Sequence, residues 1–267
     1  MDRATLHELI LVIVAYHPAA PEVLRLHECL SQLPAHIGYA VVVNDYDSGE
    51  PVELLRHNAV LFLTNKTNPG YGRAVNQAVR MLGDRGCLPA FLGALNTDLA
   101  WSVGTFRRIL EWLKDNDDVV LAVPRLINPR GELQKLCKQN PTVLGLLSRR
   151  FIPTHLKLPW LHRYDDWFIM ADADYNQVMD VPYLSGCCML FRSAPFAKVG
   201  GFDERFFLYL EDADLTRALQ KEGRTVHYPL SSVIHHWGRG NHSSKKLTLV
   251  NLHSAWIYFR KWGISLL

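Results

Sequence analysis

The chain has 267 residues, of which 48% are apolar and 21% are charged, with a formal net charge of +3. This length is enough for one large domain with a well-filled core, and the charge is too small to indicate a nucleic-acid partner. The five scattered cysteines form no C-x-x-C pair. That usage is typical of a reduced, cytoplasmic protein. No apolar segment is long enough to span a bilayer, so any membrane contact is expected to be peripheral.

Apolar runs rich in β-branched residues alternate with helical segments along the first half of the chain. Such runs are typical of strands that are buried on both faces of a parallel sheet. The predicted strands are residues 10–15, 40–43, 60–63, 90–95 and 119–123. The predicted helices are residues 21–33, 74–82 and 101–113. This order predicts an α/β fold with a doubly wound sheet.

The second half of the chain gives fewer regular signals. Residues 140–176 mix proline, tryptophan, arginine and acidic residues without a sustained period. We expect a long loop with short helical pieces there, because loops of this length are often lids or binding loops. Beyond it, the pattern predicts strands at 186–191 and 225–228, and helices at 210–222 and 247–262.

Polar turns at Tyr16, Asp45 and Asp98 follow predicted strands. Ligands of doubly wound sheets bind at these carboxyl ends. Asn96 and Asp98 are alternate residues of an extended segment and therefore share a face. Their oxygen atoms suit Mg²⁺ or Mn²⁺ bridging the phosphates of a nucleotide. The alternative is that Asp98 caps the turn before the next helix.

A second acidic group, Glu211, Asp212 and Asp214, follows the apolar and aromatic residues 206–210. Apolar neighbours raise the pKa of a carboxyl group toward the range that is useful for a general base. The alternative is that these acids lie in a first helical turn, where the helix dipole stabilises them.

Two further motifs could contact a metal or a phosphate. His235 and His236 end an apolar run, where a neutral imidazole can complete a metal's coordination shell. The alternative is one buried and one exposed histidine. The glycine-containing loop 65–76 opens a helix whose N-terminus, with Arg73, could face a diphosphate. It lacks the dinucleotide and P-loop spacings. Downstream basic residues could meet phosphate or form a solvated surface: Arg239, Lys245 and Lys246.

In this order, the motifs resemble the inverting glycosyltransferases of family 2, which have the GT-A fold. The resemblance extends from Ile10 to Gly263. The segments that carry it are 44–47, 68–76, 95–98, 185–186, 200–207, 211–215 and 235–236. It implies a single α/β domain with a Rossmann-like mixed, mostly parallel sheet flanked by helices. The implied parts are a nucleotide-binding half (1–125), an acceptor and catalytic half (126–245) and a carboxyl-terminal amphipathic helix (246–267).

The resemblance also implies a role for each motif. Asp212 would be the catalytic base, with Glu211 beside it as a second catalytic residue. Mg²⁺ or Mn²⁺ would be held by Asp98, Asn96 and His235. The nucleotide-sugar donor would be bound by Tyr16, Asp45, Asn68, Gly70, Arg73, Asn76, Asn96, Asp98, Ser185 and Gly186. Two positions depart from the family pattern: Asn96 replaces the first acid of the DxD turn, and Asn44 replaces a frequent aspartate beside Asp45.

Within the family, the chain most resembles rhamnosyltransferases of bacterial surface-polysaccharide (O-antigen or capsule) assembly, on its length, Ser185-Gly186 and its ending 258–263. This implies transfer of L-rhamnose from dTDP-rhamnose to a saccharide or a polyprenyl-diphosphate-linked saccharide, in the cytoplasm or at the inner face of the membrane. The carboxyl-terminal helix suits a bilayer interface, or else packs on the domain with a basic outer edge.

Three alternatives stay open. One is a family 2 enzyme that uses a UDP- or GDP-sugar, and another is a sugar-nucleotide-binding protein without transfer activity. The third is a nucleotidyltransferase, which usually carries a glycine-rich turn after its first strand. Residues 15–18 have no glycine.

Overall fold

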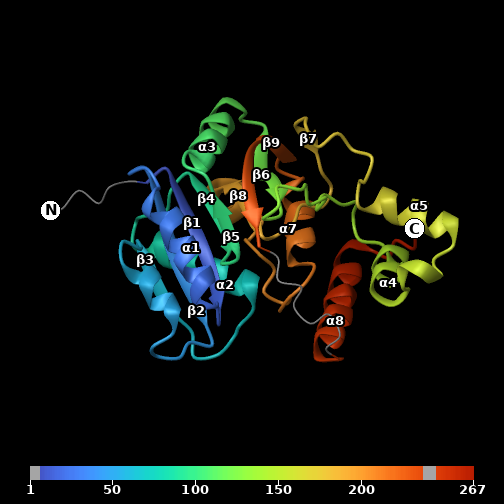
Figure 1. Cartoon of the computed structure of the whole chain (residues 1–267), viewed down its shortest axis with the longest axis horizontal. Helices are drawn as coiled ribbons and strands as arrows, with labels where there is room; N and C mark the ends of the chain where they lie inside the picture. Colours follow the sequence, from blue (N-terminus) through green and yellow to red (C-terminus); the bar gives the residue numbers. More distant parts are fainter. Residues whose placement is uncertain (1–6, 237–244) are drawn as a thin grey trace.

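The computed structural model describes residues 7–236 and 245–267 (Figure 1). Its described strands form one sheet in the order β3-β2-β1-β4-β8-β6-β9-β5, and β7 pairs with β9. The strands are β1 (Leu9–Tyr16), β2 (Ile37–Asn44), β3 (Leu61–Thr64), β4 (Phe91–Asn96), β5 (Leu99–Trp101), β6 (Val119–Ile127), β7 (Met179–Asp180), β8 (Cys188–Arg192) and β9 (Arg224–His235).

Helices cover this sheet, and α4, α5 and α8 lie beyond one end of it (Figure 1). They are α1 (Ala20–Ser31), α2 (Tyr71–Asp84), α3 (Thr105–Asp115), α4 (Val143–Phe151), α5 (Pro159–Phe168), α6 (Ser193–Lys198), α7 (Glu211–Leu219) and α8 (Lys245–Trp262), with 3₁₀ turns at Pro51–Arg56 and Thr154–Leu156. None of the described helices combines the length and the apolarity that a membrane span requires.

The predicted sheet is confirmed. β1 pairs in parallel with β2 on one side and with β4 on the other. Every residue of β2 is buried, which explains its unbroken apolar run. Antiparallel β8 then joins this parallel half to β6 and β9, so the sheet is mixed. The ends of β1, β2 and β4 lie at one edge, which places the three polar turns together.

Two predictions about local structure are wrong. The helix predicted at 101–113 begins at Thr105, because residues 99–101 form β5 and pair with β9. The stretch 140–176 is not mainly a loop: it contains the regular helices α4 and α5. Thr142 begins α4 by accepting a hydrogen bond from the Gly145 N–H at 3.0 Å, and α5 begins at Pro159. Arg239 lies outside the described residues.

The carboxyl-terminal helix α8 is anchored by the last acid of the second acidic group. The Asp214 carboxylate is buried and accepts hydrogen bonds from Lys261 Nζ at 2.8 Å and Trp262 Nε1 at 2.7 Å. Tyr258 is fully buried in a small cluster that includes Phe206. The inner side of α8 therefore packs on the domain, and Asp214 has a structural role.

Gly70, which precedes α2, has a backbone that only glycine fits. Its φ is +99°, and a Cβ at this position would lie 2.4 Å from the carbonyl oxygen of Phe207. A side chain would meet both the backbone strain of positive φ and a rigid backbone atom. The close contact holds the start of α2 against the segment that leads into α7.

Replacing Gly70 with alanine should therefore lower the free energy of unfolding by about 3 kcal/mol or more. Gly49 is a matched control, because its φ is +90° but a Cβ there would meet nothing within 4 Å. Gly49→Ala should cost only the backbone strain, about 1 kcal/mol. Urea unfolding of both variants measures the difference. Equal losses would show that the contact with Phe207 is unimportant.

Candidate active site

The pairing of β5 with β9 brings Asp98 next to His235. Leu99 is the register partner of His235, and the His236 N–H donates a hydrogen bond to the Asp98 carbonyl oxygen at 2.8 Å. The side chains meet with His235 Nε2 3.3 Å from Asp98 Oδ2. Two of the three predicted metal ligands are thus adjacent. The third, Asn96, is fixed through its backbone N–H, which donates to the Cys187 carbonyl oxygen at 3.0 Å.

Gln134 determines which nitrogen of His235 carries the proton. Its amide Nε2 donates to the His235 carbonyl oxygen at 3.1 Å, so its Oε1 must be the atom that lies 2.8 Å from His235 Nδ1. An amide oxygen only accepts, so Nδ1 is the protonated nitrogen. The lone pair of Nε2 in the neutral ring is then directed at Asp98. Sequence analysis missed Gln134, because no local motif marks it.

The Asp98–His235 pair fits a divalent cation. Asp98 Oδ1 is buried and has no hydrogen-bond partner among the described residues. Two neighbouring ligand atoms that each lie about 2.1 Å from an octahedral ion are about 3 Å apart. His235 Nε2 and Asp98 Oδ2 have a similar separation of 3.3 Å. In the described ranges, no cluster of three or more His, Cys, Asp or Glu side chains is arranged as a metal site. Protein atoms would therefore supply part of the coordination shell, and a bound diphosphate would supply more.

Asp212 lies at the start of α7 and is held against Gly186. Left-handed backbone at Tyr209 and Leu210 (φ +70° and +64°) turns the chain sharply into the helix. The Gly186 N–H donates to Asp212 Oδ2 at 2.9 Å, and the Tyr71 hydroxyl donates to the Gly186 carbonyl oxygen at 3.0 Å. A Cβ on Gly186 would lie 2.9 Å from Asp212 Cβ. Gly186 thus gives the carboxylate both a donor and room.

Residues 186 and 187 connect the Asp98 turn to Asp212, because the Asn96 N–H donates to the Cys187 carbonyl oxygen at 3.0 Å and the Gly186 N–H donates to Asp212. Burial raises the pKa of the Cys187 thiol to about 12, and the charges of Asp98 and Asp212 both add to this shift. The two carboxylates therefore lie within electrostatic reach of one buried side chain. The structure brings together two motifs that are more than a hundred residues apart in the sequence.

Glu211 differs from its neighbour Asp212. Glu211 is buried, and its Oε2 has no hydrogen-bond partner within the described part of the chain. Burial, and then the charge of Asp212, raise the pKa of Glu211 to about 8. A carboxyl group that keeps its proton at neutral pH cannot accept another one. The half-buried Asp212 is the better placed base.

The turn after β2 holds Asp45 through two residues that sequence analysis missed. His17 Nε2 lies 3.3 Å from Asp45 Oδ2, and His17 Nδ1 lies 2.8 Å from Glu50 Oε1. The hydrogen bond to Asp45, followed by the one to Glu50, raises the pKa of His17 against the effect of desolvation. The Tyr16 ring packs edge-on against His17 with its centroid 4.6 Å away and is half exposed. Tyr16 and Asp45 are thus available at one edge of the sheet.

Asn44 organises the glycine loop from inside the protein. It is buried and donates to Asn68 Oδ1 at 3.3 Å, while its own Oδ1 accepts from Asn65 Nδ2 at 2.9 Å. Asn68 Oδ1 also accepts from the Gly70 N–H at 2.9 Å. An aspartate at position 44 could not make the donated bond. The departure from the family pattern at Asn44 therefore has a structural reason.

Two predicted donor-binding residues have protein partners in this structure. Asn76 is buried, and its amide makes reciprocal hydrogen bonds with the Phe202 backbone at 2.7 and 3.0 Å. Arg73 forms an ion pair with Glu204 at 3.2 Å. Asn76 fixes the 200–207 loop to α2. Their contacts with a donor stay predictions.

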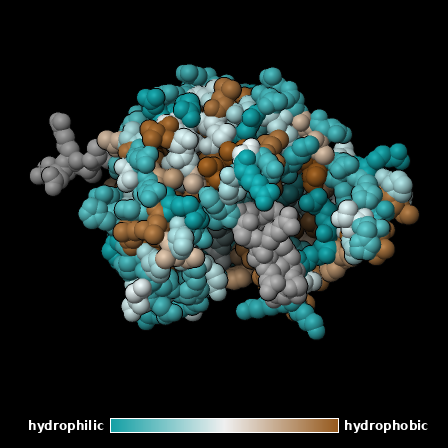
Figure 2. Space-filling model, in the orientation of Figure 1, coloured by the Kyte–Doolittle hydropathy of each residue, from teal (hydrophilic) through white to brown (hydrophobic). Residues whose placement is uncertain are grey.

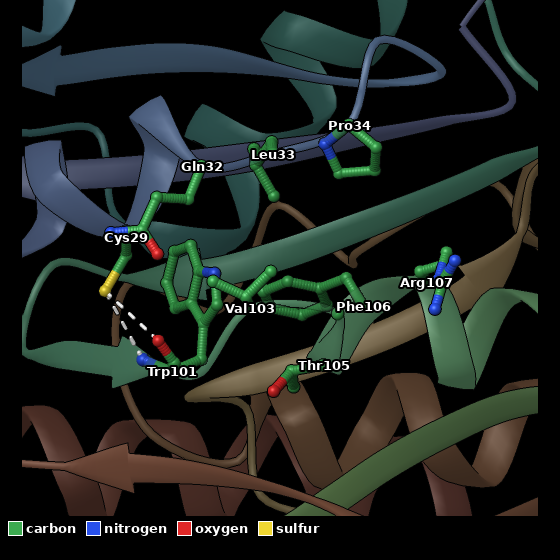
Figure 3. A pocket seen from close by; sticks show the side chains of 10 residues that line it. Cys29, Gln32, Leu33, Pro34, Trp101, Val103, Thr105, Phe106 and Arg107 are labelled. Carbon is green, nitrogen blue, oxygen red and sulfur yellow. Dashed lines mark hydrogen bonds between the residues drawn. The ribbon is translucent and has the colours of Figure 1, made fainter.

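A small pocket between the end of α1 and the start of α3 contains none of the predicted residues (Figure 3). Cys29 Sγ closes one side through hydrogen bonds with the Trp101 backbone at 3.4 and 3.6 Å. The cavity is about 10 Å³ and has room for no more than a single water. It is not a substrate site.

The model of the family "Glycosyl transferase family 2" matches residues 11–200. The chain belongs to this family. It is a glycosyltransferase, and the inverting mechanism is general to the family. The resemblance read from the motifs is confirmed at this level.

Curated relatives and solved structures agree with this assignment. The chain is 30% identical to an N-acetylglucosaminyl-diphospho-decaprenol L-rhamnosyltransferase of Mycobacterium tuberculosis, over 92% of this chain and 85% of that protein. It is 25% identical to the rhamnosyltransferase WbbL of Escherichia coli, over 88% of this chain and 86% of that protein.

The mannosyltransferase PcManGT of Pyrobaculum calidifontis, solved with GDP-Man and Mn²⁺, superposes with a TM-score of 0.62 at 13% identity. The match covers 96% of this chain and 64% of that one. TarS of S. aureus superposes with a TM-score of 0.59 at 13% identity, over 91% of this chain and 39% of that one. The fold is therefore of the GT-A type.

The raised pKa of Glu211 predicts a pH-dependent loss of stability. A pKa of about 8 when folded, against an ordinary value of 4.5, means that the folded state holds the proton more tightly. The protonated Glu211 therefore stabilises the folded state fully below pH 4.5, and this stabilisation is lost as the pH rises through about 8. Glu211→Gln is always neutral, so its stability relative to the parent should increase by a few kcal/mol from about pH 5 to pH 8.

Thermal or urea unfolding across this pH range measures the effect. Glu28→Gln is the control, because Glu28 is exposed. That variant should follow the parent at every pH. A Glu211→Gln curve parallel to the parent curve would show that Glu211 ionises normally in the folded state.

Proposed function

We propose that this chain is a metal-dependent rhamnosyltransferase of bacterial surface-polysaccharide assembly. The observation that supports the proposal is that two adjacent residues connect the acidic groups: Gly186 donates to Asp212, and Cys187 accepts from the backbone of Asn96, next to the Asp98–His235 pair. One group is suited to bind a metal–diphosphate and the other to accept a proton. An inverting transfer by single displacement needs both, since the base acts on the acceptor while the metal stabilises the diphosphate that leaves the donor.

The donor and acceptor follow from the relatives' names. The two bacterial relatives described above are rhamnosyltransferases, and the acceptor of the mycobacterial one is named as a diphospho-decaprenol-linked N-acetylglucosamine. We therefore propose dTDP-rhamnose as the donor and a saccharide, free or linked to a polyprenyl diphosphate, as the acceptor. The site of action would be the cytoplasm at the inner membrane face, with no nucleic-acid partner. A UDP- or GDP-sugar donor is the alternative.

Asp212 would act on the acceptor. Its carboxylate takes the proton from the acceptor hydroxyl as the hydroxyl oxygen forms a bond to the anomeric carbon. The bond from that carbon to the donor diphosphate breaks on the opposite face. The Gly186 N–H donates to one carboxylate oxygen of Asp212 and the Ala213 N–H donates to the other, which fixes the orientation of the carboxylate. Glu211 beneath it stays neutral at pH 7, so no second negative charge opposes the first.

Asp98 and His235, with Asn96 at the same turn, would hold the metal. A divalent cation there supplies positive charge for the leaving diphosphate. Gln134 keeps His235 in the tautomer that can bind it, because it accepts the Nδ1 proton. Tyr16 and Asp45, at the ends of β1 and β2, would contact the nucleotide.

Asp212→Asn should lower the transfer rate about 10²- to 10⁴-fold, because a positioned base contributes that much. Donor affinity should be unchanged, since Asp212 acts on the acceptor. Mass spectrometry of products with a panel of nucleotide sugars gives the rate and identifies the donor, and calorimetry gives donor affinity. Asp172→Asn, on an exposed loop, is the control and should leave both unchanged. Near-parental transfer by Asp212→Asn would contradict its assignment as the base.

Gln134→Leu should weaken Mn²⁺ binding about 10- to 100-fold, as loss of a partner that orients a histidine ligand usually does. Gln134→Glu keeps an acceptor for the Nδ1 proton and should bind Mn²⁺ more tightly than Gln134→Leu. Electron paramagnetic resonance of unbound Mn²⁺, titrated with protein in the presence of dTDP, measures affinity without turnover. Equal Mn²⁺ affinity in all three proteins would show that Gln134 does not orient a ligand.

A further inference from the structure

Exposed apolar side chains are concentrated at one end of the molecule. Residues 143–168 and 245–267 make up less than a fifth of the chain but contain 13 of the 21 large hydrophobic side chains that are exposed in the described structure. They are Leu147, Phe151, Ile152, Leu156, Leu158, Trp160, Trp167, Leu249, Leu252, Trp256, Ile264, Leu266 and Leu267. A concentration of this kind marks an interaction site.

The two segments form one structural unit, which we call the docking face. The N–H groups of Val143 and Leu144 donate to the carbonyl oxygens of Ser265 and Leu266 at 2.9 and 3.1 Å, so the chain end is fixed to the start of α4. The Arg150 side chain donates to Thr248 Oγ1 on α8 at 2.6 Å. α4, α5, α8 and the carboxyl terminus lie together in Figure 1. Figure 2 shows apolar residues on the surface at this end.

The docking face is strongly basic relative to the rest of the protein. It holds eight of the 29 lysines and arginines but only two of the 26 aspartates and glutamates. Its formal charge is therefore +6, while the remaining residues carry −3. Arg149, Arg163 and Lys245 are exposed on it. Exposed tryptophan and leucine interspersed with basic residues are typical of proteins that lie in the headgroup region of an anionic bilayer.

The docking face is also connected to the candidate active site. Lys138, shortly before α4, has its Nζ 4.3 Å from the centroid of the Tyr183 ring. Burial lowers the pKa of Lys138, the negative charge of Asp212 opposes this change, and the positive charge of Arg149 adds to it. Lys138 is therefore within electrostatic reach of both the proposed base and α4. The next residue, Gln139, is joined to α5, because its N–H donates to the Phe168 carbonyl oxygen at 2.8 Å.

We propose that the docking face binds the surface of an anionic lipid bilayer and so presents Asp212 to the membrane. This inference rests on the proposed function in one respect: a lipid-linked acceptor explains why a membrane surface should lie next to the base. The proposed membrane contact is larger than the one predicted from the sequence, which involved the carboxyl-terminal helix alone. Lys261 and Trp262 of that helix bind Asp214 instead, and Tyr258 is buried.

Flotation with lipid vesicles tests the proposal without substrate. The full chain should float with vesicles of phosphatidylcholine and phosphatidylglycerol and remain unbound with phosphatidylcholine alone. The double variant Trp160→Glu, Trp167→Glu should lower binding about tenfold or more, because both half-exposed rings would leave the interface. Val103→Glu with Leu230→Glu is the matched control, since these two side chains are as exposed but lie outside the docking face.

Charge is tested separately. Arg163→Gln and Lys245→Gln should each lower binding to the anionic vesicles about fivefold. Arg85→Gln and Arg130→Gln, exposed but outside the docking face, should have little effect. A parent chain that does not float with anionic vesicles would overturn the proposal. So would a dimer in solution that dissociates in the tryptophan variant, because a second copy would then cover the face.

Transfer activity separates this inference from the proposed function. The tryptophan variant should keep parental transfer to a water-soluble, short-chain acceptor and lose transfer to an acceptor embedded in vesicles. Vesicle binding without any transfer would support the docking face and contradict the proposed function. Parental transfer to the embedded acceptor by the tryptophan variant would overturn the docking role.

Discussion

The three-residue pairing of β5 with the end of β9 is the constraint on which the candidate site depends. It places Asp98, from the first half of the chain, beside His235, from the last strand. Because β6 runs parallel to β9, the hairpin that follows β6 also brings Gln134 to the same point, where its N–H binds the Leu126 carbonyl oxygen at 2.8 Å. A carboxylate, an imidazole and the amide that orients the imidazole are thus fixed by backbone pairing and not by flexible loops.

A second element, the turn before β8, joins the Asp98–His235 pair to Asp212. Cys187 accepts from the backbone of Asn96, and Gly186 donates to Asp212. Adjacent residues of one backbone segment therefore contact both motifs. A shift of this segment would move Asp212 relative to Asp98. The hydroxyl of Tyr71, in α2, restrains the segment by donating to the Gly186 carbonyl oxygen.

The parts of the fold that were predictable are those with a local signal. β1 and β2 are recognisable because nearly every residue is apolar and buried, and the acidic turn at Asp98 follows from the end of β4. β5 has only three residues and exists because β9 is available to pair with it. Gln134 and His17 have no motif, since their partners are distant in sequence or lie on another strand. α4 and α5 were missed because their apolar residues do not follow one buried face: Leu161 and Phe168 are buried, but Leu147, Phe151, Trp160 and Trp167 are exposed.

The acidic group at 211–214 shows how one helical turn can give three carboxyl groups different chemistry. Asp214 is buried against Lys261 and Trp262, so its charge is satisfied and anchors α8. Glu211 is buried without such partners, and its raised pKa of about 8 keeps it neutral at pH 7. Asp212 is partly buried, and its two oxygens accept from the N–H groups of Gly186 and Ala213. Because helix α8 is held by the same turn that presents Asp212, the position of the docking face relative to the base is fixed by the buried Asp214 pair. In the proposed function, the structural charge of Asp214 would thus keep the proposed base and the docking face in a fixed relation to each other.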